Sequence, residues 1–588
     1  MAIGSAREGE LVPTVTTQKD TLTARPRADP TPRSLPPAPS ASPLLEVRNL
    51  SVVFQTDAGV VAGLKNVHFS LEQGRTLAIV GESGSGKSTL ASSLNGLLAE
   101  NAFLVEGQIW FRGRDLAKLK RSEMSQVRGA QIGLVPQNPM TNLNPLQRIG
   151  TQIREALEIH GLASGRAAER QAVERLASVG LPEPALRARQ YPHELSGGMR
   201  QRALIAMGLA CRPLLLIADE PTSALDVTVQ RVILDELATA TQRLGAALIL
   251  ITHDIALAAE RADDLLVLFR GEVVEKGPVE TVLGSPVHAY TKRLIAAVPT
   301  LKSQPLVAEW RSIETQPKSS LLLDVVNLRK EYVVRRSTFG KRVSFVAVAA
   351  SSFSVERGQT VAIVGESGSG KSTTARMLLK IEQPTAGDIV FDGSEVTQLS
   401  GRELLAFRRR VQPVFQNATG SLDGRFTVRQ SIEEPLLLHG IGTRAERAKR
   451  VDQLLELVSL PTSLANRRPA EISGGQAQRV AIARALAVSP ELLVLDEAVS
   501  ALDVIVQRQI LDLLASLQRE LGLAYLFISH DLAVVRMIAH TALVMQAGVI
   551  VERGPPSRLF ERPTHPYTRQ LVAALPVMKE KKAAAARR

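Results

Sequence analysis

The stretch GESGSGKST occurs twice in this 588-residue chain, at residues 81–89 and at residues 365–373. Both copies fit the phosphate-loop pattern G-x-x-x-x-G-K-[ST], and each directly follows an apolar run that is typical of a buried strand, TLAIV or TVAIV. In such a loop the glycines let backbone N–H groups point at phosphate oxygens, and the helix that follows adds the positive end of its dipole. Two identical nine-residue matches are not accidental, so we expect two phosphate-binding sites.

Charged and hydroxyl side chains in these loops have distinct expected roles. Lys87 and Lys371 would reach the terminal phosphates, and Ser88 and Ser372 would ligate Mg²⁺. The residues expected to bind phosphate are Gly81, Ser83, Gly84, Gly86, Lys87, Ser88 and Thr89 in the first loop, and Gly365, Ser367, Gly368, Gly370, Lys371, Ser372 and Thr373 in the second.

Landmarks of the first half of the chain return in the same order in the second half. The pairs that lie 277 residues apart are Ser196 with Ser473, Asp219 with Asp496, and His253 with His530. This repeat is far longer than the unit of a solenoid, so we expect a tandem duplication of one self-sufficient domain. The predicted fold class is α/β: two tandem P-loop NTPase domains, each with a mostly parallel sheet core, an antiparallel β subdomain and a helical subdomain.

The composition of the chain changes at the expected domain boundaries. The first copy is placed at residues 45–299 and the second copy at residues 321–576, joined by a mainly polar linker at 300–320. Residues 1–44 are rich in Pro, Ser and Ala without apolar periodicity, so we expect them to be disordered. Residues 577–588 form a basic tail.

Apolar periodicity predicts the order of elements in the first copy. Alternating apolar residues in LLEVRNLSVVF and VAGLKNVHFSLEQG predict half-buried antiparallel strands. Apolar spacings of three and four from about residue 148 to 211 predict helices, and LLLIADE and AALILI then predict buried strands. The sole cysteine, Cys211, lies in an apolar run, where we expect a buried small side chain without chemistry.

Two acidic residues close a buried strand in each copy. Asp219 and Asp496 are expected to hold Mg²⁺, directly or through water, as the second acidic strand does in P-loop NTPases. The adjacent Glu220 and Glu497 are candidates to orient or deprotonate the attacking water.

A Ser-Gly-Gly sequence opens a predicted helix in each copy, in LSGGMRQR and in ISGGQAQR. Ser196 and Ser473 would cap these helices, and the same exposed N–H groups would form an anion site with Gly198 and Gly475. Between a phosphate loop and an acid-terminated strand, this stretch resembles the signature motif of ABC ATPases.

The resemblance to ABC ATPases covers nearly all of residues 45–576, because the other family landmarks follow in order in both copies. Gln137 and Gln416 match the Q-loop, which also contributes to the metal site, and SALD, found in both copies, matches the D-loop. His253 and His530 match the switch histidine, although a lone histidine after an apolar strand is usually structural.

The resemblance implies two composite ATP sites, each between the phosphate loop of one copy and the signature of the other, so that the two copies pair within the chain. The first site would use Lys87, Ser88, Gln137, Asp219, Glu220 and His253 with Ser473 and Gly475; the second would use Lys371, Ser372, Gln416, Asp496, Glu497 and His530 with Ser196 and Gly198. Phe54 and Tyr332 resemble the adenine-stacking aromatic of the family, and ordinary strand packing explains them equally well.

The composition restricts the cellular location and the classes of partner that we expect for this chain. No apolar run approaches the roughly 18 residues of a membrane helix, and with one cysteine and no signal-peptide pattern we expect a cytoplasmic protein. The formal charge of +13 is spread along both halves without a basic-plus-aromatic motif, so we expect no nucleic-acid partner.

The closing segments SPVHAYTKRLIAAVP and RPTHPYTRQLVAALP resemble those of oligopeptide and dipeptide importer ATPases, a branch that includes glutathione and nickel uptake systems. This resemblance implies an ATP-hydrolysing subunit on the cytoplasmic face of the inner membrane. Its expected partners are two membrane-spanning permease subunits, which dock on Gln137, Gln416 and the helical stretches after them, and an extracytoplasmic solute-binding protein. The alternative is a cytosolic tandem ABC ATPase that acts on ribosomes or nucleic acid; the cargo stays open among peptides, glutathione, nickel chelates and other solutes.

Overall fold

The computed structural model describes residues 43–56, 59–222, 225–307, 320–335, 342–500 and 502–576. The expected disorder covers residues 1–44, of which residues 1–42 lie outside the described residues, as does the basic tail at 577–588. Most of the expected linker, residues 308–319, also lies outside them.

An antiparallel sheet of four strands opens the first copy, in the order β2-β1-β4-β5. The central strand β1 (Leu45–Thr56) pairs with β2 (Gly59–Leu71) and β4 (Ala102–Phe111), and β5 (Arg114–Asp115) pairs antiparallel with β4 at the edge of the sheet. Alternate residues of β1 are buried on either side of an irregularity in strand pairing. The predicted half-buried antiparallel strands are confirmed.

The core sheet of the first copy has six strands in the order β10-β9-β3-β8-β7-β6. Strand β3 lies between β8 and β9 and is parallel to both, whereas β10 is antiparallel to β9. The strands are β3 (Thr76–Val80), β6 (Ile132–Val135), β7 (Leu215–Asp219), β8 (Ala247–Ile251), β9 (Asp264–Phe269) and β10 (Glu272–Pro278). Because β3 and β7 point the same way, the phosphate loop after β3 and the acids after β7 meet at one edge of the sheet.

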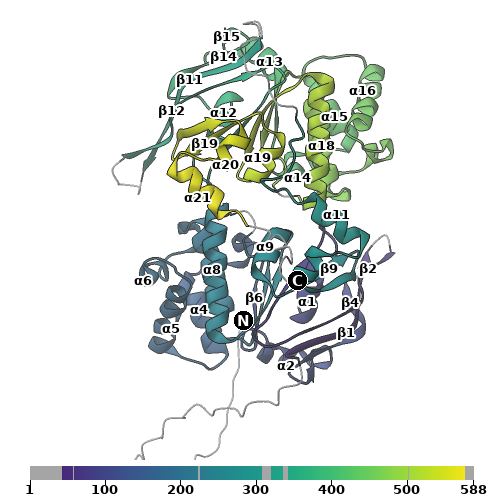
Figure 1. Cartoon of the computed structure of the whole chain (residues 1–588), viewed down its shortest axis with the longest axis vertical. Helices are drawn as coiled ribbons and strands as arrows, with labels where there is room; N and C mark the ends of the chain where they lie inside the picture. Colours follow the sequence, from purple (N-terminus) through teal and green to yellow (C-terminus); the bar gives the residue numbers. More distant parts are fainter. Residues whose placement is uncertain are drawn as a thin grey trace, which may run out of the picture. The chain divides into compact units, whose positions relative to one another are not determined.

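Helices from the middle of the first copy's sequence form a cluster beside its strands (Figure 1). In that cluster α4, α5 and α7 pack together around buried Leu, Ile and Ala side chains, which confirms the predicted helical stretch. Cys211 belongs to the same core as a buried free thiol, as expected. The helices are α1 (Lys87–Leu94), α2 (Arg121–Val127), α3 (Pro139–Asn142), α4 (Ile149–Ile159), α5 (Gly165–Ser178), α6 (Pro184–Arg187), α7 (Gly197–Gly208), α8 (Val227–Leu244), α9 (Ile255–Arg261), α10 (Val279–Gly284) and α11 (Ala289–Ala297), with 3-10 turns η1 (Leu116–Lys118) and η2 (Pro192–Glu194).

The second copy repeats this architecture with the strand orders β12-β11-β14-β15 and β16-β17-β18-β13-β19-β20. Its strands are β11 (Leu321–Arg335), β12 (Arg342–Glu356), β13 (Thr360–Val364), β14 (Ala386–Phe391), β15 (Ser394–Glu395), β16 (Val411–Val414), β17 (Leu492–Asp496), β18 (Ala524–Ser529), β19 (Thr541–Gln546) and β20 (Val549–Gly554). The predicted α/β fold, with a parallel core, an antiparallel subdomain and a helical subdomain, is confirmed in both copies.

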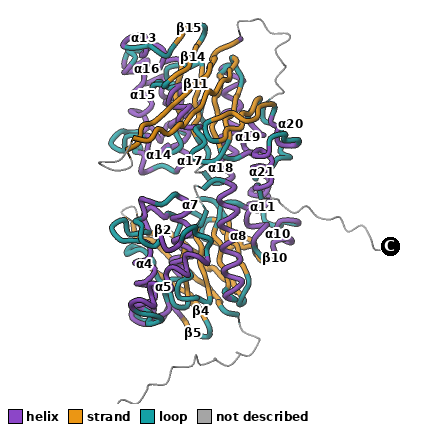
Figure 2. Tube along the Cα trace, turned by 90° about the vertical axis from the view of Figure 1, so that its left-hand side faces the viewer, coloured by secondary structure: helices purple, strands orange, loops and turns teal. Residues whose placement is uncertain are grey.

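In Figure 2 helices α13, α15 and α16 of the second copy lie on one side of its strands. They are α12 (Lys371–Leu378), α13 (Gly401–Arg410), α14 (Ala418–Ser421), α15 (Val428–Leu438), α16 (Arg444–Leu457), α17 (Gly474–Leu486), α18 (Val504–Leu521), α19 (Leu532–Ile538), α20 (Pro556–Glu561) and α21 (Pro566–Ala574), with 3-10 turns η5 (Thr462–Asn466) and η6 (Pro469–Glu471). Within the described part of the chain, no helix combines the length and apolar character that a bilayer crossing requires.

Candidate nucleotide sites

Each phosphate loop leaves its strand at a glycine and enters its helix through another glycine in a left-handed conformation. Gly86 has φ 106° and caps α1, and Gly370 has φ 105° and caps α12. A Cβ atom at Gly86 would lie 2.7 Å from the carbonyl oxygen of Gly63, and one at Gly370 would lie 2.5 Å from that of Ala347. Only glycine satisfies both the conformation and the close backbone approach, so the loop has one geometry in the two copies.

The lysine of each loop folds back over the loop itself. The Lys87 ammonium donates hydrogen bonds of 2.8 Å to the carbonyl oxygens of Gly81 and Glu82, and Lys371 makes the same contacts in the second copy at 2.7 Å. Burial lowers the pKa of both lysines, while the acids at the end of the neighbouring strand oppose this shift. A desolvated ammonium held in this place can bind phosphate oxygens with little competition from water.

The loop serine and the strand-end aspartate lie together in each copy. The Ser372 hydroxyl donates to a carboxylate oxygen of Asp496 at 3.3 Å, and Ser88 is hydrogen-bonded to Asp219. Burial raises the pKa of both aspartates, since the ionised carboxylate has lost much of its water. Hydroxyl and carboxylate oxygens are the ligands that Mg²⁺ prefers, so the chemistry of this pair fits a magnesium ion.

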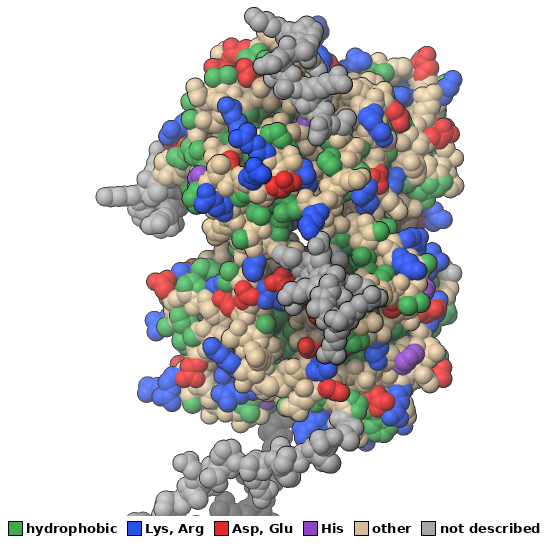
Figure 3. All heavy atoms as spheres, viewed as in Figure 1, with side chains coloured by type: hydrophobic (Ala, Val, Ile, Leu, Met, Phe, Trp, Pro, Cys, Tyr) green, Lys and Arg blue, Asp and Glu red, His purple; other side chains and the backbone are tan. Residues whose placement is uncertain are grey.

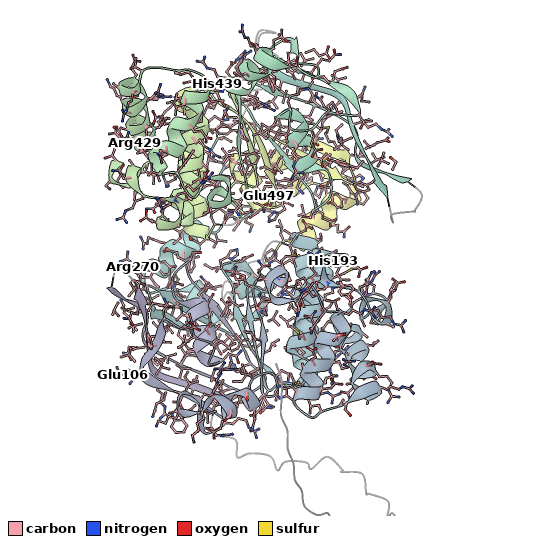
Figure 4. All side chains as sticks on the ribbon, turned by 180° about the vertical axis from the view of Figure 1, so that it is seen from behind. Glu106, His193, Arg270, Arg429, His439 and Glu497 are labelled. Atoms are coloured by element: carbon pink, nitrogen blue, oxygen red, sulfur yellow. The ribbon has the colours of Figure 1, made fainter. Side chains whose placement is uncertain are left out.

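The glutamate that follows the strand has an unusual backbone conformation in both copies. Glu220 has φ 45° and Glu497, labelled in Figure 4, has φ 49°, in the left-handed region that L-residues rarely adopt. Their backbone N–H groups donate to Ile251 and Ile528 at the end of the neighbouring strand. The same backbone conformation therefore sets the direction in which the carboxylate leaves the strand in both copies.

Each of these carboxylates contacts the Q-loop glutamine and the switch histidine. The Gln137 side-chain N–H donates to one oxygen of Glu220 at 2.6 Å, and His253 Nδ1 lies 3.2 Å from the other oxygen. The corresponding distances from Glu497 are 2.7 Å to Gln416 and 3.4 Å to His530.

These contacts set the protonation of the glutamate and histidine pair. Burial by itself would raise the pKa of Glu220, but the hydrogen bond and the charge of His253, together with Lys87, outweigh it and lower the pKa. Burial likewise opposes the charged form of His253, and Glu220 outweighs it and raises the histidine pKa. The second copy has the same directions. An ionised carboxylate in this position can accept a proton from water, and the histidine can hold that carboxylate in place.

The signature serines cap their helices as the sequence predicts. Ser196 accepts from the backbone N–H of Met199 at 3.4 Å, and Ser473 accepts from that of Gln476 at 3.3 Å. A Cβ atom at Gly475 would lie 2.4 Å from Val506 of α18, so this glycine lets the signature helix approach α18 closely. Gly198 has the same relation to α8, with Val229 at 2.8 Å. The hydrogen bonds of both serines stay within their own helix starts.

Some contacts between the two copies involve the last residue of the D-loop and the start of α8. The Asp226 carboxylate accepts a hydrogen bond from the backbone N–H of Ser367 in the second phosphate loop. Thr228, at the start of α8, donates to the Glu366 carboxylate in the same loop at 2.6 Å. In the reciprocal direction, the charge of Asp503 acts on Lys87 in the first loop. The last residue of each SALD motif, Asp226 or Asp503, therefore lies near the phosphate loop of the other copy.

Sequence reasoning did not include Asp226, Thr228 or Asp503 among the site residues. The SALD motif, which ends at Asp226 and at Asp503, was the signal that could have found two of them. No sequence motif marks Thr228, because the equivalent position of the second copy is Ile505.

The aromatic candidates lie next to the last residue of each phosphate loop. A Cβ atom at Gly63 would lie 2.5 Å from the Phe54 ring and 3.5 Å from the Thr89 methyl group, so both side chains border the same glycine. Tyr332 is hydrogen-bonded to Thr373 of the second loop. Stacking of either ring on adenine stays a prediction.

Comparison with known proteins identifies the relatives of the chain. The family model described as "ABC transporter" matches residues 64–223 and 348–500, and the one described as "Oligopeptide/dipeptide transporter, C-terminal region" matches residues 274–322 and 551–588. The glutathione import ATP-binding protein GsiA of Pectobacterium atrosepticum is 45% identical over 558 residues, which cover 91% of this chain and 90% of that protein. The protein of the same name from Escherichia coli K12 is 44% identical over 565 residues with the same coverage. A bacterial ABC transporter cassette solved as a dimer is 30% identical and covers 40% of this chain and 99% of its own, with a TM-score of 0.37.

Proposed function

This chain belongs to the ABC transporter family, as an ATP-hydrolysing import subunit with the oligopeptide/dipeptide C-terminal region, and we propose that it powers peptide uptake through two composite ATP sites. The observation that carries this proposal is the position of Asp226, which lies on the first copy and binds the phosphate loop of the second. A residue that belongs to one copy and contacts the nucleotide loop of the other makes hydrolysis depend on how the copies are paired.

Each proposed site takes its phosphate loop, metal ligands and acid from one copy and its signature from the other. The first site comprises Lys87, Ser88, Gln137, Asp219, Glu220 and His253 with Ser473 and Gly475; the second comprises Lys371, Ser372, Gln416, Asp496, Glu497 and His530 with Ser196 and Gly198. ATP brings charge that neither copy can neutralise alone, so its binding favours the closed pair, and hydrolysis to two anions favours opening.

Magnesium is the second cofactor of the proposal. Ser88 with Asp219, and Ser372 with Asp496, would hold the ion against the phosphates, and the side-chain oxygens of Gln137 and Gln416 would complete each set. When bound, the metal neutralises the charge that develops on the phosphates. The chain's own contribution is to hold Glu220 and Glu497 ionised, where each can orient a water molecule.

A membrane permease is the partner implied by an import subunit, and we propose two different permease subunits. After Gln137 the first copy exposes apolar side chains: Met140 is 61% exposed and Leu146 is 86% exposed. In the second copy the equivalent loop reads ATGSLDGRF and carries an exposed ion pair between Arg425 and Asp423. Because the two docking loops differ in chemistry, we expect them to contact different helices of the membrane subunits. The first loop would dock through apolar contacts and the second through polar contacts.

The location follows from this partnership. The protein would lie peripherally on the cytoplasmic face of the inner membrane and act with an extracytoplasmic solute-binding protein. Lys and Arg side chains are scattered among acidic ones on the face drawn in Figure 3, without one basic patch. This distribution favours docking through local contacts over a general attraction to anionic polymers.

We propose a small peptide as the cargo. The relatives in Pectobacterium atrosepticum and Escherichia coli are named for the import of glutathione, itself a tripeptide.

We further propose that the first copy spans residues 45–299 and the second copy residues 321–576, with the linker at 300–320 and terminal segments at 1–44 and 577–588.

Affinity purification from detergent-solubilised source membranes, with mass spectrometry after a salt wash, tests the proposal. We expect two polytopic membrane subunits and a solute-binding protein, and we expect a Met140→Ser, Leu146→Ser double variant to lose one membrane subunit. A Val105→Ser variant controls for loss of an exposed apolar side chain elsewhere, since Val105 is 64% exposed on β4, away from the Q-loop and the helices after it. Recovery of ribosomal proteins or nucleic acid without a membrane subunit would overturn the proposal.

A further inference from the structure

The closing segment of each copy reaches back to the phosphate loop of the same copy. The Tyr290 hydroxyl accepts a hydrogen bond of 2.9 Å from the backbone N–H of Glu82, the second residue of the first loop. The Tyr567 hydroxyl accepts one of 3.0 Å from the backbone N–H of Glu366, the second residue of the second loop. We infer that Tyr290 and Tyr567 are positioning residues for ATP binding, which hold the phosphate loops in their binding conformation. This inference rests on the assignment of the two loops as nucleotide sites.

A hydrogen-bonded turn precedes the helix that contains each tyrosine and fixes the start of that helix. In the first copy the Glu275 carboxylate accepts from the backbone N–H groups of Val287 and His288, and His288 Nδ1 accepts from the backbone N–H of Tyr290. The turn is therefore anchored on β10 and capped by its own histidine, so the tyrosine enters α11 in a defined direction.

The same arrangement recurs in the second copy. Glu552 of β20 accepts from the backbone N–H groups of Thr564 and His565, and His565 Nδ1 accepts from the backbone N–H of Tyr567. An identical set of contacts in two copies, made by the His-Ala-Tyr and His-Pro-Tyr sequences, indicates that the closing segment has a purpose beyond ending the domain.

Burial makes the tyrosine ring a rigid support. Tyr290 is 1% exposed and stacks on Phe269 with ring centroids 4.1 Å apart. Burial raises the pKa of Tyr567 to about 12 and also raises that of Tyr290, so both hydroxyls stay protonated at neutral pH. A ring fixed in this way holds its hydroxyl oxygen in one place.

The hydrogen bond acts on the first turn of the loop. The backbone of Glu82 is held at both ends, since its N–H donates to Tyr290 and its carbonyl accepts from Lys87. The loop is thereby curled before it binds phosphate. Ordering a loop in advance reduces the entropy lost on binding, so removing this support should weaken ATP binding more than it slows the chemical step.

The closing helices also contact the other copy. Helix α11 packs against α18, where Ile505 joins the apolar cluster that contains Tyr290 and Leu294. Helix α21 packs against α8, and the Arg231 guanidinium donates to the carbonyl oxygen of Ala573. Each closing helix thus connects the phosphate loop of its own copy to the helix that follows the D-loop of the other copy.

The two loops do not depend equally on their tyrosines. The Glu366 side chain has a second support, the 2.6 Å hydrogen bond from Thr228. The equivalent of Thr228 is Ile505, whose side chain has no hydrogen-bonding group to offer Glu82. The first loop should therefore depend more on Tyr290 than the second loop depends on Tyr567.

Tyr290→Phe and Tyr567→Phe test the inference, because phenylalanine keeps the ring and removes only the hydroxyl. Tyr525→Phe is the matched control: this fully buried hydroxyl donates to Leu514 at 2.9 Å, and both residues lie outside the loop. Each variant is made in the full chain with one site disabled. Lys371→Ala disables the second site when the first loop is tested, and Lys87→Ala disables the first site when the second loop is tested. ATP KM and kcat, fluorescent-nucleotide affinity, and hydrogen exchange of peptides that contain Glu82 or Glu366 are measured.

We expect Tyr290→Phe to raise KM about 3- to 10-fold, which corresponds to one lost hydrogen bond, with little change in kcat. Hydrogen exchange of the peptide that contains Glu82 should become faster. Tyr567→Phe should change KM and exchange less than Tyr290→Phe does, and Tyr525→Phe should change neither KM nor exchange. Unchanged exchange and KM in Tyr290→Phe would overturn the inference, as would equal effects in Tyr525→Phe. Nucleotide binding and exchange are read on the chain alone, so failure of the import proposal would leave this result interpretable.

Discussion

Asp226 of the first copy accepts a hydrogen bond from the backbone N–H of Ser367, a residue of the second phosphate loop that lies 141 positions further along the chain. Burial raises the pKa of this carboxylate, and the N–H group of Ser367 and the charges of Lys371 and His530 oppose the shift. The first copy thus supplies an acidic group to the environment of the second site.

Replacement of Asp226 by alanine should impair the second site selectively. The change removes a charge-assisted hydrogen bond to the loop, so we expect turnover at that site to fall about 10-fold. The measurement is phosphate release in a Glu220→Gln background, in which the second site is the one left competent. Asp512→Ala, which removes an exposed acid on α18, is the control and should change nothing. Unaltered turnover in Asp226→Ala would mean that the contact is dispensable.

Glu220→Gln and Glu497→Gln, made separately, should each disable one site. Glutamine keeps the shape and loses the basic oxygen, and general-base catalysis contributes about 10²- to 10⁴-fold in rate. Total turnover should fall to about half if the sites act independently, and much further if they act in concert. Glu260→Gln is the matched control on α9, where the acid pairs with Arg261. A variant with the turnover of the unmodified protein would identify its site as silent.

The Glu220 and His253 pair should make stability depend on pH. The histidine pKa is raised in the folded chain, so its contribution is fully present below about 6.5 and is lost as pH rises through the folded value. The glutamate pKa is lowered, so its contribution is present above its ordinary value of 4.5 and is lost as pH falls through the folded value. Stability from the pair should therefore be greatest from about pH 4.5 to 6.5.

Thermal unfolding of the unmodified chain and of His253→Asn, compared across pH, checks this expectation. The difference in Tm should be largest in that window and should shrink above it. His68, for which the same substitution removes a histidine on β2, provides the control. A difference that is constant across pH would argue against the ion pair.

Gly86→Ala should destabilise the first copy by about 1–3 kcal/mol, because it combines a left-handed backbone with a clash against the Gly63 carbonyl. Gly74→Ala is the matched control, since Gly74 has φ 75° and its added Cβ would meet open space. The difference between their unfolding midpoints in denaturant isolates the cost of the close approach. Equal midpoints would show that the loop can move away from β2.

The fold could be predicted from the sequence to the level of its subdomains. Buried strands such as β3 and β7 are short, continuous apolar runs, and the alternation in β1 indicates a half-buried antiparallel strand. The irregular pairing within β1 could not be predicted, because it depends on the partner strands. The sequence also could not predict which side chains Gln137 and His253 contact, although both residues were expected at the site.

Short motifs along the chain specify which groups are available at each site, because the chemistry of the phosphate loop, the strand-end acids and the signature depends on neighbouring residues. The contact of Tyr290 with Glu82 across 208 residues, and that of Asp226 with Ser367 of the other copy, arise only when the chain is folded. The physical reason is that such contacts need two distant segments held at hydrogen-bond distance, and that distance is set by how the sheets and helices pack, which no local pattern encodes.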